Sequence, residues 1–159
     1  MIRTAQFSDC MKYRYTLYRQ WSDEPKVMCI GLNPSTANGA TDDATINRLC
    51  NVLPYHRYGA FYMVNLYALI TPHPEVLFSV PDPMGENEKW IYDTAAKCDE
   101  IIFCWGNFKG IGYRANQMKK RFPQAWCFGH NADGSPWHPR ALHYKGIQSH
   151  DVQLIRFKK

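Results

Sequence analysis

The stretch Val27-Met28-Cys29-Ile30-Gly31-Leu32-Asn33-Pro34-Ser35-Thr36 decides the expected fold. Its first four residues are all apolar, which is typical of a strand buried on both faces of a parallel sheet. The residues that follow are small, polar or conformationally stiff, as in a tight turn at the end of such a strand. The sequence therefore predicts a buried strand whose carboxyl end carries a polar loop.

The rest of the chain repeats this pattern. Three further apolar runs lie at residues 60–64, 100–105 and 125–128. Helical spacing of apolar side chains characterises the intervening segments, at residues 43–53, 87–97 and 113–122. The alternation of strands and helices predicts βαβ units and an α/β sheet. Residues 13–21 alternate in a β-like way and predict an edge hairpin or extra strand, and residues 151–157 alternate similarly and would close the domain.

The composition agrees with a single globular domain over residues 1–159. Hydrophobic residues make up 45% of the chain, enough for a real core. No apolar run is long enough to span a bilayer, and the first residues lack the apolar core of a signal peptide. We therefore expect a cytoplasmic protein that does not bind membranes. The net charge of +5 permits a polyanionic partner without requiring one.

The cysteines and histidines do not form a metal-binding pattern. None of the six cysteines forms a CxxC pair, and none of the six histidines forms an HExxH or HxxxH pair. Cys29, Cys104 and Cys127 sit in apolar runs, where a thiol behaves as a small hydrophobe. Reduced core thiols are thus favoured over a zinc site or a disulfide framework.

The loops after the four apolar runs are the expected place for chemistry, because ligands of open α/β sheets bind outside the carboxyl ends of the strands. Each of these loops carries an Asn or a His; they span residues 31–36, 65–68, 106–110 and 129–140. This shared feature is a stronger signal than any single motif.

The first loop can present Asn33 rigidly. Gly31 allows conformations that a side chain forbids, and Pro34 holds Asn33 extended. Ser35 can offer a hydroxyl to a phosphate or a water. A tight strand-to-helix turn with local hydrogen bonds explains these residues equally well.

Asp42 and Asp43 follow closely and could orient a water molecule with a carboxylate. A helix N-cap with a neighbouring acidic residue is the favoured interpretation of this pair.

The second run ends at Asn65, whose amide presents a donor and an acceptor side by side and could read a base edge. Tyr67 could stack on a base, although core packing explains it better.

In the fourth loop, Pro139 fits the first turn of a helix and leaves His138 at its entrance. There His138 can donate a hydrogen bond to a leaving group, and Arg140 can meet a phosphate. A capping histidine and a solvated arginine are the alternative.

Two of these loops resemble motifs of the uracil-DNA glycosylase superfamily. Gly31-Leu32-Asn33-Pro34-Ser35 resembles the first motif, in the form of the mismatch-specific class, and His138-Pro139-Arg140-Ala141-Leu142 resembles the second. Asn65 matches the Asn that closes the second strand in many members. The sequence is also similar to the DUF1643 family, which carries this Asn-Pro-Ser-Thr, Asp-Asp, Asn-Leu and His-Pro pattern.

The resemblance implies a three-layer α/β/α sandwich around a short, mainly parallel sheet. It implies a DNA glycosylase that cleaves the N-glycosidic bond of a damaged, mismatched or modified base, with no metal or organic cofactor. We expect the protein to be a monomer. Asn33 would position the water, with Asp42 or Asp43 as further water-activating candidates, and His138 would stabilise the departing base. Asn65 would read the base beside Gly31, Ser35 and Tyr67, and DNA would meet Arg140, Lys145 and Lys109.

Two other functions fit the same residues. One is a nucleic-acid-binding protein of the same fold that reads a modified base without cutting it. The other is a hydrolase of free nucleosides or nucleotides, which would have a closed pocket and no basic groove.

Overall fold

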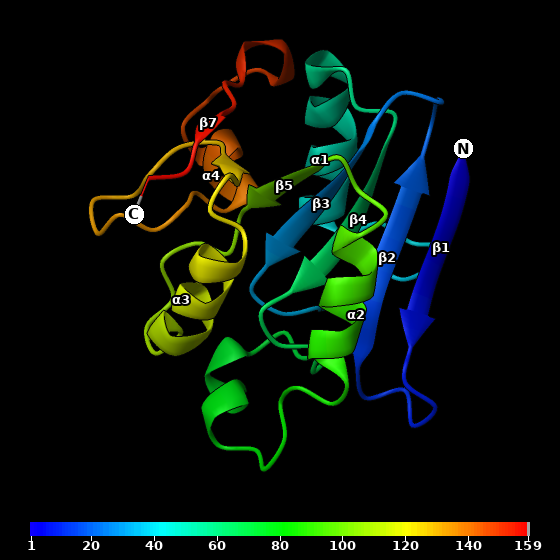
Figure 1. Cartoon of the computed structure of the whole chain (residues 1–159), viewed down its shortest axis with the longest axis vertical. Coiled ribbons are helices and arrows are strands. Elements are labelled where there is room, and N and C mark those ends of the chain that lie inside the picture. Colours follow the sequence, from blue (N-terminus) through cyan, green and yellow to red (C-terminus); the bar gives the residue numbers. More distant parts are fainter. Residues whose placement is uncertain (159) are drawn as a thin grey trace.

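A seven-stranded sheet runs through the computed structural model, which describes residues 1–158 (Figure 1). The strands lie side by side in the order β1-β2-β4-β3-β5-β6-β7. Their bounds are β1 (Ile2–Phe7), β2 (Arg14–Gln20), β3 (Lys26–Gly31), β4 (Ala60–Asn65), β5 (Glu100–Phe103), β6 (Trp126–Cys127) and β7 (Ile155–Arg156). The helices are α1 (Ala44–Val52), α2 (Asn87–Ala95), α3 (Gly112–Arg121) and α4 (Pro139–Tyr144), with short 3₁₀ turns η1 (Leu53–His56), η2 (Pro74–Phe78) and η3 (Ser149–Asp151).

The sheet is mixed, so the expectation of a mainly parallel sheet is wrong. β3 pairs in parallel with β4 and β5, and β5 pairs in parallel with β6. The amino-terminal hairpin β1–β2 adds antiparallel pairs, since β2 also lies antiparallel to β4. The returning strand β7 adds another beside β6. The α/β class is confirmed, with a parallel centre and antiparallel flanks.

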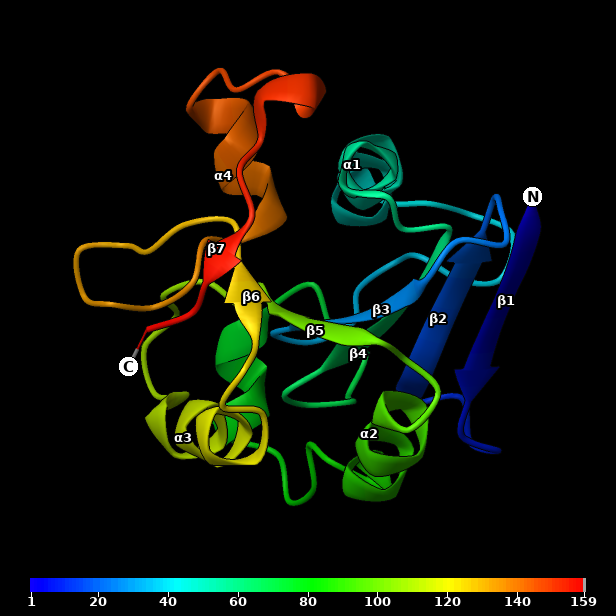
Figure 2. The ribbon, with the colours of Figure 1, turned by 45° about the horizontal axis from the view of Figure 1, so that its top comes forward.

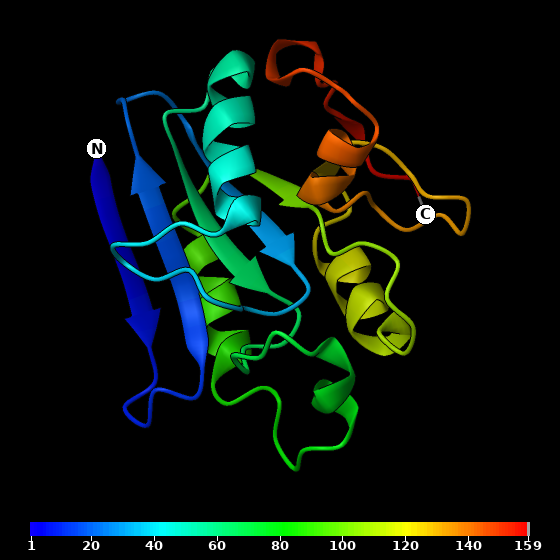
Figure 3. The same ribbon diagram turned by 180° about the vertical axis from the view of Figure 1, so that it is seen from behind.

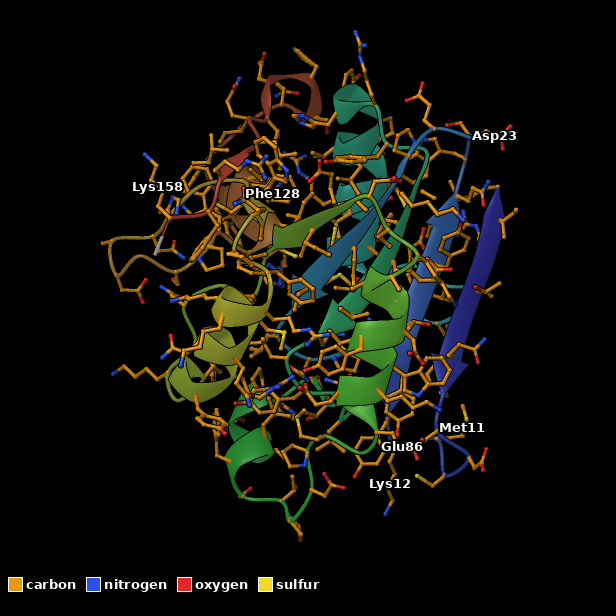
Figure 4. All side chains as sticks on the ribbon, in the orientation of Figure 1. Met11, Lys12, Asp23, Glu86, Phe128 and Lys158 are labelled. Atoms are coloured by element: carbon orange, nitrogen blue, oxygen red, sulfur yellow. The ribbon has the colours of Figure 1, made fainter. Side chains whose placement is uncertain are left out.

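Helices cover both faces of this sheet (Figure 2). On β3, Val27 and Cys29 face the cluster that contains α1 and α4, whereas Met28 and Ile30 face the cluster that contains α2 and α3. Successive side chains of a strand point to opposite faces, so both must be apolar where both faces are covered. Figure 4 shows Phe128 beside α4, where it packs in the same cluster as Leu142.

The three helices expected from apolar spacing are confirmed as α1, α2 and α3. Asp43 is the N-cap of α1, and its Oδ1 accepts a hydrogen bond from the Ile46 amide at 2.9 Å. α3 ends at Arg121, before Pro123, which cannot continue a helix. Cys29, Cys104 and Cys127 are buried free thiols, as expected.

A β-bulge at Tyr15 breaks the alternation of β2. The register passes from Gln6 opposite Thr16 to Phe7 opposite Arg14, which leaves Tyr15 as the extra residue. Tyr15 stacks on Trp90 of α2, at a ring-centroid distance of 5.5 Å. Arg14 instead reaches the opposite face, where its Nη1 donates to Ala37 O at 3.0 Å. Bulges redirect side chains in this way.

Arg19, further along β2, is fully buried on the same face as Arg14. Its Nη2 lies 2.8 Å from Asp42 Oδ1 and donates to Asn38 O at 2.7 Å, and its Nε donates to the same Asp42 oxygen. The guanidinium thus ties β2 to the segment that leads from β3 into α1.

We expect Arg19→Met to lower the free energy of unfolding by about 1–3 kcal/mol, because it leaves Asp42 Oδ1 and Asn38 O without their donor from the buried guanidinium. Urea denaturation measures this change. Arg3→Gln is the matched control, since Arg3 contacts the same Asp42 from a side chain that is 40% exposed. Its effect should stay below about 1 kcal/mol. Equal effects of the two substitutions would contradict the assignment.

Candidate functional site

The carboxyl ends of β3 and β4 lie side by side and point the same way (Figure 3). Gly31 is opposite Asn65 in the register. The two loops continue this pairing beyond the strands, because the Leu66 amide donates to Gly31 O at 2.9 Å and the Tyr67 amide donates to Leu32 O at 3.1 Å. The loops after the first two apolar runs are therefore held together as a unit.

Gly31 leaves room for the side chain of its neighbour. A Cβ atom at this position would lie 2.8 Å from Asn65 Oδ1 and 2.5 Å from Met63 Cε. Both distances are shorter than carbon atoms tolerate, so any larger residue would displace the Asn65 amide or the Met63 methyl. Gly31 thus permits a close approach to Asn65 at the end of the two strands. Its role in base binding stays a prediction.

A cavity of about 240 Å³ opens at this edge of the sheet. It lies between the two loops and the amino-terminal ends of α1 and α4. Its size is below the roughly 300–1,000 Å³ typical of pockets for drug-sized ligands, so it suits a single small group. Six of the residues proposed from the sequence line it: Asn33, Ser35, Asp43, Asn65, His138 and Arg140.

Asn33 fastens the first loop to the second. Its Nδ2 donates to Thr71 O at 2.8 Å and to Leu69 O at 3.4 Å, and the Thr71 amide donates in return to Pro34 O at 3.0 Å. Asn33 therefore both holds the two loops together and lines the cavity. Its amide nitrogen is engaged by the backbone, which leaves Oδ1 as the atom that can accept a hydrogen bond from a water or ligand.

Asn65 is 3% exposed, and its Nδ2 has no hydrogen-bond partner within residues 1–158. A buried amide without a partner is costly, by about 1–3 kcal/mol for each group. Such groups are uncommon in folded proteins, and one that lines a cavity is a candidate for ligand recognition. Its backbone is fixed independently, since Asn87 Nδ2 donates to Asn65 O at 2.8 Å.

His138 reaches the cavity because a loop folds back on itself. The long segment between β6 and His138 is closed by a bridge between His130 and Pro136, and the Trp137 amide donates to Gly129 O at 2.9 Å. Gly129 is required there, since a Cβ would lie 2.5 Å from the Trp137 ring. His138 thus follows the end of the sheet in space, although many residues separate it from β6.

The imidazole of His138 is neutral and has a defined tautomer. Burial is the main cause that lowers the pKa of His138 from 6.5 to about 4, and the positive charge of Arg140 lowers it further. The negative charge of Asp43 raises the pKa by a smaller amount. His138 is the N-cap of α4, and its Nδ1 accepts a hydrogen bond from the Arg140 amide at 3.1 Å. A neutral ring that accepts at Nδ1 carries its proton on Nε2. His138 is therefore a hydrogen-bond donor through Nε2.

Arg14 is the charged site residue that the sequence analysis missed. It lines the cavity although it is only 3% exposed and begins a strand of the amino-terminal hairpin. The bulge at Tyr15 turns it toward the cavity, and a regular alternation would have placed it on the other face. The sequence signal that could have identified Arg14 was a charged residue within an aromatic, strand-like stretch. Thr71, Pro72 and Pro74 also line the cavity and were not singled out.

Four other predicted residues lie elsewhere. Asp42 is held by Arg19 and Arg3 and does not line the cavity. Tyr67 packs in the core beside Phe78, with a ring-centroid distance of 6.1 Å, in agreement with its favoured structural interpretation. Lys145 lies over the Trp137 ring, 4.6 Å from its centroid, just beyond α4. Lys109 is exposed in the loop after β5.

Up to Lys158, the structure contains no group of three or more His, Cys, Asp or Glu side chains arranged to hold a metal ion. Within the same part of the chain, no helix is long and apolar enough to cross a membrane.

Residues 14–140 match the family model described as "Protein of unknown function (DUF1643)". The chain belongs to the DUF1643 family. The matched segment begins at Arg14 and ends at Arg140, so it contains every residue that lines the cavity. This DUF1643 protein matches no curated protein and no solved structure.

The lowered pKa of His138 gives a pH-dependent stability. The unfolded chain takes up a proton near pH 6.5, whereas the native state keeps His138 neutral to about pH 4. The free energy of unfolding should therefore fall as the pH is lowered from about 6.5 to about 4, because the unfolded state binds the proton more readily. His138→Ser keeps an N-cap acceptor and removes the titration. Its unfolding free energy, measured in urea, should depend less steeply on pH in this window, and an unchanged slope would contradict the prediction.

Proposed function

We propose that this DUF1643 protein hydrolyses the N-glycosidic bond of a damaged, mismatched or modified base in DNA, and that it is related to the uracil-DNA glycosylase superfamily. One observation carries the proposal. Asn65 and His138, which lie far apart in the sequence, line one small cavity, the first with an unpartnered amide and the second with a free Nε2–H. The flanking helices, on both faces of the sheet, agree with the three-layer architecture of that superfamily.

The electrostatics of bond cleavage match these two groups. When the glycosidic bond breaks, negative charge develops on the base and positive charge on the sugar. The Nε2–H of His138 can stabilise the first, because a preorganised donor in a water-excluded site can contribute about 2.7–4 kcal/mol to transition-state stabilisation. The amide of Asn65 supplies directional hydrogen bonds to a base edge.

The attacking water has two candidate partners among the other residues of the lining. Asn33 can accept a hydrogen bond from it through Oδ1, since its Nδ2 is engaged with Thr71 O. Asp43 lines the same cavity and uses only Oδ1 to cap α1. A carboxylate is the stronger base, so we assign proton acceptance to Asp43 and orientation of the water to Asn33.

DNA would approach over α4. A base inside a duplex has to leave the stack to enter such a cavity, at a cost of about a few kcal/mol. Arg140 is exposed and borders both the cavity and a second hollow lined by Arg48 and His143. These cationic and polar side chains can hold the phosphates next to the extruded nucleotide.

The proposal is tested by incubating the protein with DNA duplexes and single strands that carry a panel of altered bases, and by scoring abasic sites. For any base that is released, His138→Ser should slow release by roughly a hundredfold or more, because one transition-state donor is lost. His150→Ser is the matched control, since His150 is exposed on η3 and lies outside the cavity lining. The absence of abasic sites with every base, or full activity of His138→Ser, would contradict the proposal.

DNA binding should weaken as the salt concentration rises, since lysine and arginine contacts to phosphates release counterions. Arg140→Gln should reduce the slope of log affinity against log salt by about 1, the value expected for one lost phosphate contact. Fluorescence anisotropy with a labelled oligonucleotide measures both quantities. Lys89→Gln is the matched control, because Lys89 is exposed on α2, on the other face of the sheet. A slope that Arg140→Gln leaves unchanged would place the DNA elsewhere.

A further inference from the structure

Arg14 differs from the other buried arginines of the protein. Arg14, Arg19 and Arg114 are 3%, 0% and 5% exposed. Arg19 lies 2.8 Å from Asp42, and Arg114 lies 2.6 Å from Glu88. Arg14 has no carboxylate within 4.0 Å in the described part of the chain. Its guanidinium is the buried cation that lacks a carboxylate partner, and it is also the one that lines the cavity.

The guanidinium of Arg14 forms hydrogen bonds through only one of its three nitrogens in the described part of the chain. Nη1 donates to Ala37 O at 3.0 Å, which fixes one end of the group. Nε is buried and has no hydrogen-bond partner, and no hydrogen bond is formed by Nη2 to any residue up to Lys158. The Nε–Nη2 edge is therefore without a partner, and Nε itself is buried. This edge presents two parallel N–H groups, the geometry that binds a carboxylate or phosphate through two oxygens.

The charge of Arg14 persists despite its burial. Burial lowers the pKa of Arg14 to about 10, partly offset by the negative charge of Asp43. The group therefore remains protonated at neutral pH. An isolated buried charge is costly, and this cost falls when an oppositely charged partner arrives.

The surrounding side chains favour an anion over a neutral ligand. Two arginines, Arg14 and Arg140, and one carboxylate, Asp43, line the cavity, while His138 is neutral. The lining thus carries one net positive charge. Asp43 directs one oxygen into the cap of α1, and Asn65 adds an unpartnered N–H donor. Two N–H donors of the lining, Arg14 Nε and Asn65 Nδ2, thus lack an acceptor.

We propose that Arg14 binds an oxyanion carried by the ligand of this cavity. This inference rests on the proposed function, because it takes the ligand to be a nucleobase or nucleotide. The oxyanion has two possible sources in such a ligand: a carboxylate attached to a modified base, or a phosphate of the nucleotide. In either case the substrate is selected by its charge as well as by the base edge that Asn65 reads.

The experiment compares matched ligands that differ only by the anion. The five common deoxynucleosides, with deoxyuridine included, are paired with their 5′-monophosphates, and deoxyuridine and deoxycytidine are paired with their 5-carboxy derivatives. Isothermal titration calorimetry gives the affinity of each. In at least one pair the charged member should bind about tenfold more tightly or better, as expected for a charge-assisted bidentate contact. The pair that shows the effect identifies the source of the oxyanion.

Variants of Arg14 decide whether this residue is responsible. Arg14→Met should reduce the ratio of affinities within the pair toward one. Arg14→Lys keeps the charge without the two-pronged edge and should lower the ratio in part. If Arg14→Met does not fold, Arg14→Lys tests the role of Arg14 in its place. Lys89→Gln should leave the ratio unchanged, because Lys89 lies on the other face of the sheet.

Two results would overturn the inference: equal affinities of charged and neutral members in every pair, or a charge preference that survives in both Arg14 variants. These outcomes are independent of the glycosylase assay. A protein that forms abasic sites without any charge preference refutes the role of Arg14 alone. A charge preference without abasic sites refutes the reaction and favours a binder or a hydrolase of free nucleotides.

Discussion

The contact between Gly31 and Asn65 is the constraint on which the site depends. These residues face each other where the parallel strands β3 and β4 end, and a larger residue than glycine would have to displace the Asn65 amide or the Met63 methyl. The same pairing extends into both loops through the Leu66 and Tyr67 amides. Because these hydrogen bonds hold the two loops together, the residues that line the cavity are fixed to the buried sheet. A bulky residue in place of Gly31 would disturb both the strand ends and the proposed base-reading group.

Asp43 and His138 each cap a helix and also have a role in the proposed reaction. Asp43 caps α1 through Oδ1, and His138 caps α4 through Nδ1. Capping leaves the second polar atom of each side chain available, and it fixes the orientation of that atom. In His138 it also selects the tautomer with Nε2–H. Capping was the rival interpretation of both residues from sequence, but the two roles use different atoms and are compatible.

Much of the architecture follows from the sequence because apolar periodicity reports burial. The central strands were identified since both of their faces are covered, and three helices by their apolar stripes. The exposed β1 has little apolar alternation and was not expected. An edge hairpin or extra strand was expected over residues 13–21, yet the sheet was still expected to be mainly parallel. Six cavity residues were found because they follow strands. Arg14 was missed because a single bulge, which periodicity does not encode, turns it toward the site.

The placement of the unpartnered groups has a physical consequence for binding. Arg14 and Asn65 extend from neighbouring strands, and Asp43 and His138 stand at the first turns of α1 and α4. Side chains on such elements lose little freedom when a ligand arrives, so more of the contact energy remains for affinity and discrimination. The unpartnered Nε of Arg14 and Nδ2 of Asn65 lower the stability of the free protein. A ligand that satisfies both recovers this loss, whereas one that lacks the matching acceptors leaves them buried and unpaired. A fixed, under-satisfied cavity therefore discriminates mainly by rejecting ligands without acceptors.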